Sequence, residues 1–313
     1  MKKLLGIILP GLLCCNLILA DQKPGRFFED QPDVTEDNQI HFNYLLAADS
    51  EDRELDINGK MEKILLELNE VMLKATTEHK KGDGVARKYK FDYRADGKLD
   101  ITFIRMDMKH KDLHKWANND IIPFLNKVKG MNNVKKHYYN FADFSNVDGG
   151  EAGVGYGTTY LKSNNNGTDE KKLLVTLHEL HHSNGGGYSC VPGMSGNVHY
   201  SNQEKKVQLT QGRKLGSTYA HGKLDCPQLQ DSVFLTPSSK TPYDPYEVNC
   251  LFKLGKYTNK KIIKVINKMK KNPDKKIGHK TRFGSSCRYR DWDRAKGGFY
   301  IWGVDENIAT TLK

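Results

Sequence analysis

Residues 173–187 read LLVTLHELHHSNGGG, and the interpretation of the whole chain starts from this stretch. We expect a helix from Leu173 to Ser183, ended by the glycines at 185–187. In such a helix His178 and His182 lie about 40° apart, one turn above the other. Both imidazoles can therefore reach one metal ion.

The H-E-x-x-H pattern predicts a zinc site with its own acid–base group. Glu179 lies about 100° from His178, beside an ion rather than on it, where it can take a proton from a zinc-bound water. His181 lies about 100° from His182 and is the poorer partner for the pair. The alternative is a histidine-rich polar helix that binds metal only incidentally.

The segment before this helix alternates between strand and helix patterns. Ile40, Phe42, Tyr44 and Leu46 alternate on one face and predict a strand, and from Lys60 apolar residues recur at helical spacing. Further expected elements are strands at 89–93 and 99–103 with a turn at Asp96-Gly97, a helix over Leu113–Lys129 bent or restarted at Pro123, a strand from His137, an edge strand within Gly153–Tyr160, and an N-cap at Thr168 or Asp169. This order predicts an α+β fold, a twisted mixed sheet backed by helices and followed by a less regular, disulfide-tied part.

HELHHSNG fits the pattern HExxHxxG, and on this motif the chain resembles the metzincin metallopeptidases of the zincin superfamily, in their exported bacterial form. QIHFNYLLAADSEDR, GKLDITFIRM and GVGYGTTY resemble the upper domain of such a peptidase, from about residue 39 to 187. SCVPGMSGNVHYSN and KLDCPQLQDSVF resemble later segments of these proteins.

The resemblance implies a zincin fold with the motif on an active-site helix, one bound Zn²⁺, and hydrolysis of peptide bonds with Glu179 as general base. The strand at 153–160 would then pair with an extended peptide substrate. Two alternatives stay open. One is a zinc hydrolase of another amide, such as a wall-peptide amidase, and the other is a non-catalytic surface-binding protein that keeps the fold.

The third zinc ligand is harder to predict. We favour His199 in GNVHYSN, because imidazole suits zinc and the glycines before it let the chain turn back. Glu204 is the second choice, since its distance from His182 resembles that of the glutamate-ligand zincins. Tyr188 stands where the usual metzincin ligand stands and is expected to be a wall residue or a switch-like oxygen near the water. The remaining alternatives are His221, Asp225 and Asp231.

The ends of the chain differ in character from its body. Residues 1–20 have a charged start and an apolar middle, as in a secretory signal peptide, so we expect an exported protein with no stable membrane span. Residues 21–38 read as a loose acidic leader. The catalytic part is expected to comprise an upper subdomain at 39–187 and a lower one at 188–250, before a basic region at 251–313.

The leader could lie in the active-site cleft, with Asp30, Asp33 or Asp37 approaching the zinc. A carboxylate binds zinc less firmly than a thiolate, so we expect any such block to be partial.

Four cysteines remain once the signal peptide is removed, which suits two disulfides in an exported protein. The expected pairs are Cys190–Cys226, which flanks the loop of the third ligand, and Cys250–Cys287, which flanks a lysine-rich helix expected at 259–271.

The formal net charge of +11 is concentrated in the basic region, where residues 251–313 carry 17 Lys and Arg but 5 Asp and Glu. One interpretation is a solvated lysine-rich helix, and the other is a surface that meets anionic partners. No nucleic-acid partner is expected, and the main partner is a peptide or protein substrate.

Overall fold

The computed structural model describes residues 23–129, 131, 133, 135–144, 148–153, 155–184, 210–222, 228–240, 242, 271, 280–281 and 284–285. The four cysteines expected to form disulfides lie outside these residues, as do the glycines at 185–187 and all but the last residue of the helix expected at 259–271.

The main elements of the described residues are five strands and three helices. The strands are β1 (Gln39–Leu46), β3 (Ile101–Arg105), β4 (Lys136–Ala142), β5 (Gly150–Gly153) and β6 (Tyr156–Tyr160). The helices are α2 (Lys60–Thr77), α3 (Asn118–Val128) and α4 (Asp169–Ser183). Shorter elements are β2 (Lys88–Tyr89), η1 (His110–Asp112), η2 (Asn164–Asn166), β7 (Thr210–Gln211), β8 (Lys214–Leu215), η3 (Leu229–Asp231), β9 (Leu235–Thr236), β10 (Lys280–Thr281) and β11 (Gly284–Ser285).

The five main strands form one mixed sheet in the order β3-β1-β4-β6-β5. β3, β1, β4 and β6 are parallel, and β5 pairs antiparallel with β6 at the edge. The predicted α+β class with a mixed sheet is therefore confirmed.

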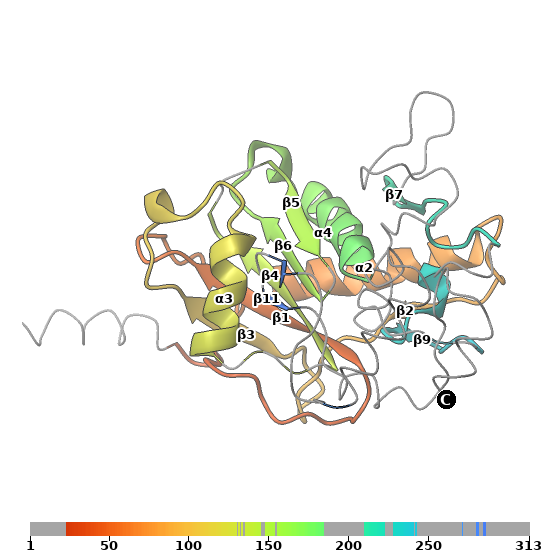
Figure 1. Cartoon of the computed structure of the whole chain (residues 1–313), viewed down its shortest axis with the longest axis horizontal. Helices are drawn as coiled ribbons and strands as arrows, with labels where there is room; N and C mark the ends of the chain where they lie inside the picture. Colours follow the sequence, from red (N-terminus) through yellow and green to blue (C-terminus); the bar gives the residue numbers. More distant parts are fainter. Residues whose placement is uncertain are drawn as a thin grey trace, which may run out of the picture.

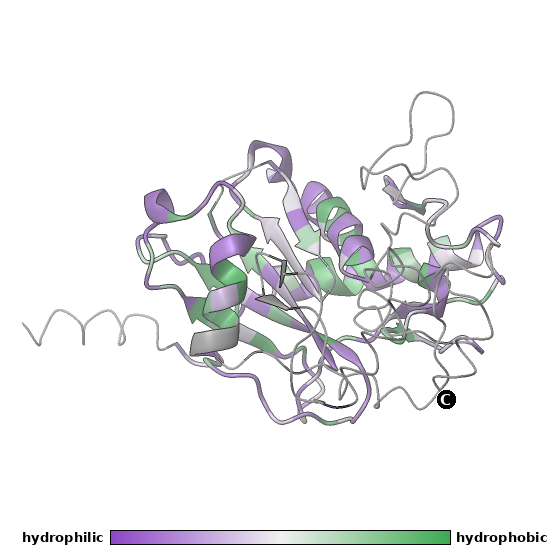
Figure 2. Ribbon diagram, in the orientation of Figure 1, coloured by the Kyte–Doolittle hydropathy of each residue, from purple (hydrophilic) through white to green (hydrophobic). Residues whose placement is uncertain are grey.

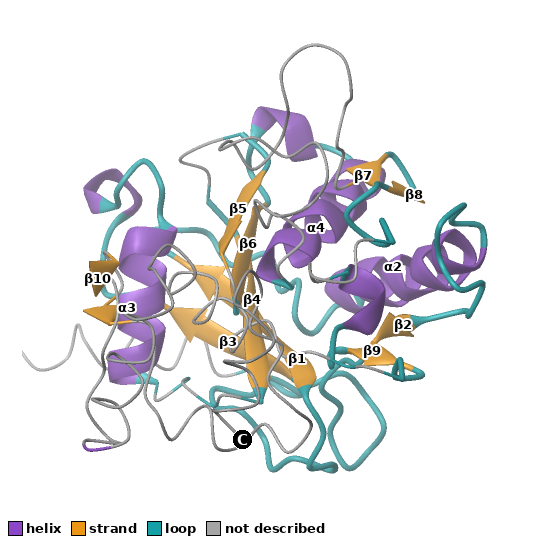
Figure 3. Cartoon of the chain, turned by 45° about the vertical axis from the view of Figure 1, so that its right-hand side comes forward, coloured by secondary structure: helices purple, strands orange, loops and turns teal. Residues whose placement is uncertain are grey.

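The helices cover the two faces of this sheet, with α3 on one side and α2 and α4 on the other (Figures 1 and 3). The crossover from β1 to β3 runs toward one edge of the sheet, and the crossover from β3 to β4 runs back toward the other. Because crossovers between parallel strands are right-handed, the two connections place their helices on opposite faces.

Each face carries its own apolar core. Ile40, Phe42, Tyr44 and Leu46 of β1 face α2 and α4, as their alternation predicts, whereas Leu45 belongs to the core under α3. Every residue of β1 is buried, because this strand lies inside a sheet covered on both sides. Figure 2 shows that α4 carries both apolar and hydrophilic residues, and its apolar Leu173, Leu177 and Leu180 belong to the core on this face.

The hairpin expected from 89–93 and 99–103 is present, but it is shorter than predicted. The turn at Asp96-Gly97 is found, with Gly97 at φ 79°, and Tyr93 and Leu99 form an isolated antiparallel bridge. Beyond that bridge the two segments separate. β2 pairs with β9, more than a hundred residues away in the sequence, while β3 joins β1 in the main sheet.

The second expected helix is shorter than predicted. α3 begins at Asn118 rather than near Leu113, after the short turn η1. The Asp120 carboxylate accepts the backbone N–H of His114 at 2.7 Å, which holds the preceding loop outside the helix. Pro123 lies inside α3, which continues past it without a restart.

The edge strand also differs from the prediction. The stretch 153–160 does not form the edge, because β6 lies between β4 and β5. Gly155, at φ 86°, lies between β5 and β6 and lets the chain reverse there, so that Gly150–Gly153 becomes the outer strand.

Residues 23–38 are not a loose leader. The Phe27 carbonyl accepts the N–H of Phe103 at 2.8 Å, so the segment pairs beside β3. Arg26 is buried, lies over the Phe103 ring at 3.9 Å, and bonds to Asp52 at 2.6 Å and Asp56 at 2.8 Å. The expectation failed because it was based on composition, which does not register these long-range partners.

The described part of residues 210–240 packs against helices α2 and α4. Tyr219, Leu229 and Phe234 are buried in the same core as α2 and α4.

No described helix has both the length and the apolar character needed to cross a membrane.

Candidate metal and catalytic site

Helix α4 carries the H-E-x-x-H residues and begins at Asp169, before Leu173 but where the predicted N-cap at Thr168 places its start. Thr168, one of the two predicted N-caps, accepts the backbone N–H of Lys171 through its side chain at 3.2 Å. The helix therefore has a defined start, and its last turn ends at Ser183.

His178 and His182 face each other on α4. Their Nε2 atoms are 3.2 Å apart, and their ring centroids are 4.8 Å apart. Two nitrogens bound to one tetrahedral zinc at 2.0–2.1 Å would be separated by about 3.3 Å. The two imidazoles therefore fit a shared zinc ion through their Nε2 atoms.

Glu179 is buried between α4 and the edge strand. A Cβ atom on Gly150 would lie 2.5 Å from the Thr158 carbonyl oxygen and 2.8 Å from the Glu179 Cγ atom, so β6 and Glu179 together leave no room for a side chain there. Burial, and then the nearby charge of Glu151, raise the pKa of Glu179 to about 8. A carboxyl group in this range can both accept and return a proton near neutral pH.

His181 points away from the pair, as the helical spacing predicts. It is fully buried, and its Nδ1 atom lies 2.7 Å from the carbonyl oxygen of Leu177 and 3.2 Å from the Tyr89 hydroxyl. Burial lowers the pKa of His181 to about 3, so this ring stays neutral. Its position in the core excludes it from a site shared with His178 and His182.

The edge strand beside Glu179 is fastened to the start of α3. The Glu151 carboxylate accepts the backbone N–H of Asn118 at 2.7 Å and also the Tyr160 hydroxyl. The Asn118 amide donates to the Glu151 carbonyl at 3.1 Å and accepts from Thr158 at 2.6 Å. These bonds fix the position of β5 relative to α3 and β6.

The favoured third ligand, His199, lies outside the described residues, as do Tyr188, Glu204 and Asp225. The other two alternatives are described. His221 follows β8, where its backbone N–H donates to the Gln228 side chain at 2.8 Å, and Asp231 ends η3. The described residues therefore include two of the three predicted zinc ligands, His178 and His182, and the predicted base Glu179.

A second group of side chains of the kinds that bind metal ions lies near the start of the parallel strands. Single ligand atoms of Asp30, His41, Asp92 and Asp100 lie within 4.8 Å of one another. The Lys136 ammonium lies among them, 2.5 Å from Asp30 and 2.8 Å from Asp92. This cation pairs with Asp30 of the N-terminal segment and with Asp92, so the group forms an ion-pair cluster that links residues 23–38 to the sheet.

Three residues near the site were not predicted from the sequence. Gly150 is required by the close approach of Glu179, Glu151 fastens the edge strand, and Thr210 of β7 places its Oγ1 atom 3.4 Å from His178 Nδ1. The glycines at 149, 150 and 153 are a sequence signal that could have indicated a close backbone approach at Gly150. The other two contacts carry no local sequence signal.

Fold and site together define an α+β protein with a histidine pair and a buried glutamate on one helix, beside an antiparallel edge strand. No protein-family model and no curated protein matches the chain. Among solved structures it is similar to OgpA from Akkermansia muciniphila, at 16% identity and a TM-score of 0.36 over 50% of each chain.

Two further solved structures are similar. A catalytically inactive OgpA in complex with an O-glycopeptide substrate is 15% identical, with a TM-score of 0.35 over 50% of each chain. Archaemetzincin from Methanopyrus kandleri is 14% identical, with a TM-score of 0.30 over 53% of this chain and 86% of the other. The chain spans about half the length of the OgpA structures.

Proposed function

We propose that this protein is a zinc-dependent endopeptidase. The observation that carries the proposal is the 3.2 Å separation of the His178 and His182 Nε2 atoms, with Glu179 on the same helix. This separation suits two ligands of one tetrahedral zinc. Imidazole nitrogens, rather than carboxylates alone, also favour zinc over calcium or magnesium.

The roles of the residues follow from their positions. His178 and His182 hold the zinc, with His199 as the proposed third ligand. When bound, the ion polarises the scissile carbonyl and lowers the pKa of water. Glu179 takes a proton from the attacking water and passes it to the leaving amine, a role that its position on α4 beside His178 allows.

The substrate is proposed to bind along β5. This strand is paired on one side by β6 and forms the edge of the sheet next to Glu179. An extended peptide that adds to such an edge forms backbone hydrogen bonds with little dependence on its sequence. A peptide placed there lies beside the helix that carries the histidine pair.

Export is a further part of the proposal. The apolar start of the chain and the even number of later cysteines favour a secreted or periplasmic protein with disulfides 190–226 and 250–287. The basic region at 251–313 is proposed to meet anionic partners. Mass analysis of the exported protein tests the cleavage of the signal peptide, non-reducing peptide mapping tests the disulfides, and binding to anionic surfaces tests the basic region.

The test of function combines metal content with peptide cleavage. Purified protein should contain one zinc per chain and cleave members of a diverse peptide library, and a chelator should abolish cleavage. His178→Ala and His182→Ala should each lose the zinc and the activity, whereas His110→Ala, at an exposed histidine, should keep both.

Other outcomes separate the alternatives. Zinc binding with cleavage of wall-peptide amides but of no peptide bond would identify an amidase. Zinc binding without any hydrolysis would identify a binding protein of this fold. An active protein without metal would contradict the proposal.

A further inference from the structure

The hairpin formed by β7 and β8 lies close to the Nδ1 atom of His178. Thr210 in β7 has its Oγ1 atom 3.4 Å from His178 Nδ1, while His178 Nε2 faces His182. The two nitrogens of this imidazole thus have different neighbours. Nε2 belongs to the histidine pair, and Nδ1 lies toward the hairpin.

A histidine that binds zinc through Nε2 must carry its ring proton on Nδ1. That N–H is normally donated to a carboxylate, a carbonyl or a water, which fixes the tautomer and the ring orientation. A threonine hydroxyl can also accept it. The 3.4 Å separation is long for a hydrogen bond, as contacts around a site often are before its ligand binds.

The hairpin that carries Thr210 is fastened to both neighbouring helices by one side chain. Arg213 lies between β7 and β8, and its Nε atom donates to Glu170 in the first turn of α4 at 3.0 Å. Its Nη2 atom bonds to the second oxygen of the same carboxylate and to Glu67 of α2 at 2.5 Å. A two-point contact with one carboxylate restricts the orientation of the guanidinium group.

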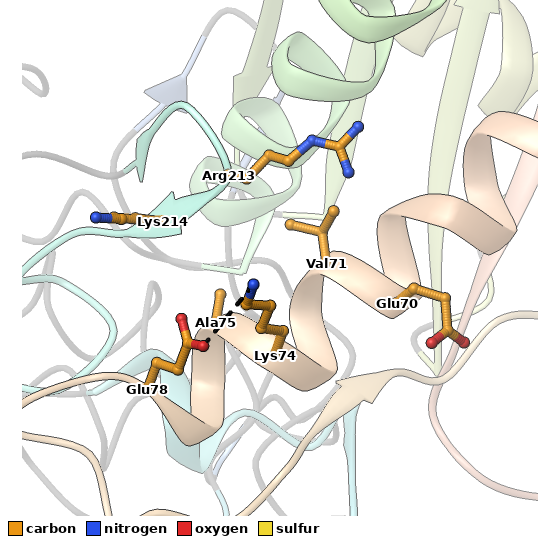
Figure 4. A pocket seen from close by; sticks show the side chains of 7 residues that line it. All are labelled: Glu70, Val71, Lys74, Ala75, Glu78, Arg213 and Lys214. Atoms are coloured by element: carbon orange, nitrogen blue, oxygen red, sulfur yellow. Dashed lines mark ion pairs between the residues drawn. The ribbon is translucent and has the colours of Figure 1, made fainter.

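Part of the hairpin stands away from α2. A cavity of about 330 Å³ lies between them, lined by Glu70, Val71, Lys74, Ala75, Glu78, Arg213 and Lys214 (Figure 4). Continuous apolar packing therefore does not hold this side of the hairpin against α2. The described attachments there include the Arg213 bonds, the buried Leu215 and a bond from His79, just after α2, to the Gly216 carbonyl at 3.0 Å.

We propose that Thr210 is a positioning residue that orients His178 for zinc, and that Arg213 keeps Thr210 in place. This inference rests on the proposed function, because it assigns a partner to one of the proposed ligands. The hairpin thereby contributes to metal affinity without binding the metal.

The first test measures zinc affinity by competition with a chromogenic chelator. Thr210→Val keeps the shape of the side chain but removes the acceptor, and should weaken zinc binding about 10–100-fold. Thr210→Ser restores the hydroxyl and should bind zinc nearly as well as the unaltered protein. Arg213→Gln should have a smaller effect, about two- to fivefold. Lys214→Gln, in the same hairpin, should have none.

The second test does not require metal. Nitrogen NMR of the metal-free protein should show His178 with its proton on Nδ1, and Thr210→Val should give a mixture of tautomers. Melting curves of the metal-free variants should match that of the unaltered protein, which would show that the fold is kept.

Distinct results overturn the two proposals. If the unaltered protein binds zinc and Thr210→Val binds it equally well with an unchanged tautomer, the role of Thr210 is wrong and the proposed function stands. If the unaltered protein binds no zinc, the proposed function is wrong and the role of Thr210 in metal binding is wrong with it.

Discussion

Glu179 is the residue whose chemistry is easiest to separate from its structural role. Glu179→Gln has nearly the same shape but cannot accept a proton, so turnover should fall by about two to four orders of magnitude while zinc is retained. Peptide cleavage rates and metal content of the same preparation check this. Glu78→Gln, at an exposed position at the end of α2, should change neither. Loss of zinc from Glu179→Gln would instead give Glu179 a structural role.

His137 predicts how stability depends on pH. It is buried and stacks on Phe234 at a centroid distance of 3.6 Å, and burial lowers its pKa to about 3. The unfolded chain binds this proton near pH 6.5. Between about pH 6.5 and 3 the unfolded state therefore holds more protons, and stability falls as the pH falls, by at most about 1.4 kcal/mol per pH unit.

His137→Phe removes this titration and keeps the ring. Its melting temperature should drop less between pH 7 and pH 5 than that of the unaltered protein, and the same change at exposed His110 should leave the drop as it is. An unaltered drop in His137→Phe would show that other groups cause the acid sensitivity.

At the scale of elements, one lysine joins the N-terminal segment to the start of β4. Lys136 is buried, and its ammonium lies 2.6 Å from Asp33 as well as near Asp30 and Asp92. Lys136→Met should lower the free energy of unfolding by about 3–5 kcal/mol, because it leaves the buried Asp92 carboxylate and the partly buried Asp30 and Asp33 without their cation. Denaturant titration measures this change.

The neighbouring lysine provides the control. Lys135 is half exposed and pairs with the exposed Glu36 at 3.0 Å, so Lys135→Met should cost less than about 1 kcal/mol. Equal effects of the two substitutions would show that the cluster around Lys136 does not hold the segment.

At the scale of the whole molecule, residues 23–38 belong to the folded body. A chain that begins at residue 39 loses the Arg26 contacts with Asp52 and Asp56 and the pairing of Phe27 beside β3. Loss of buried ion pairs at about 3–5 kcal/mol should lower its melting temperature by about 6–20 °C. Melting curves of chains 21–313 and 39–313 test this.

Peptide cleavage by the same two chains distinguishes a structural segment from an inhibitor. The shorter chain should be no more active than the longer one. A rise of more than about a hundredfold, equivalent to roughly 2.7 kcal/mol, would show that the segment blocks the site.

Several features were predictable from the sequence because they depend on neighbouring residues. The alternation in β1, the helical spacing from Lys60 and the spacing of His178 and His182 each span a few residues. Local patterns of this kind fix the type of an element and the face on which a side chain lies. The α+β class, two proposed ligands and a proposed base follow from them.

The tertiary structure decided what depends on distant residues. Lys136 meets Asp30 across 106 positions of sequence, and Thr210 meets His178 across 32. The placement of β5 at the edge depends on how the chain reverses at Gly155. No periodicity encodes these contacts, because they arise when the packed cores bring separate segments together, and they decide which residues support the histidine pair.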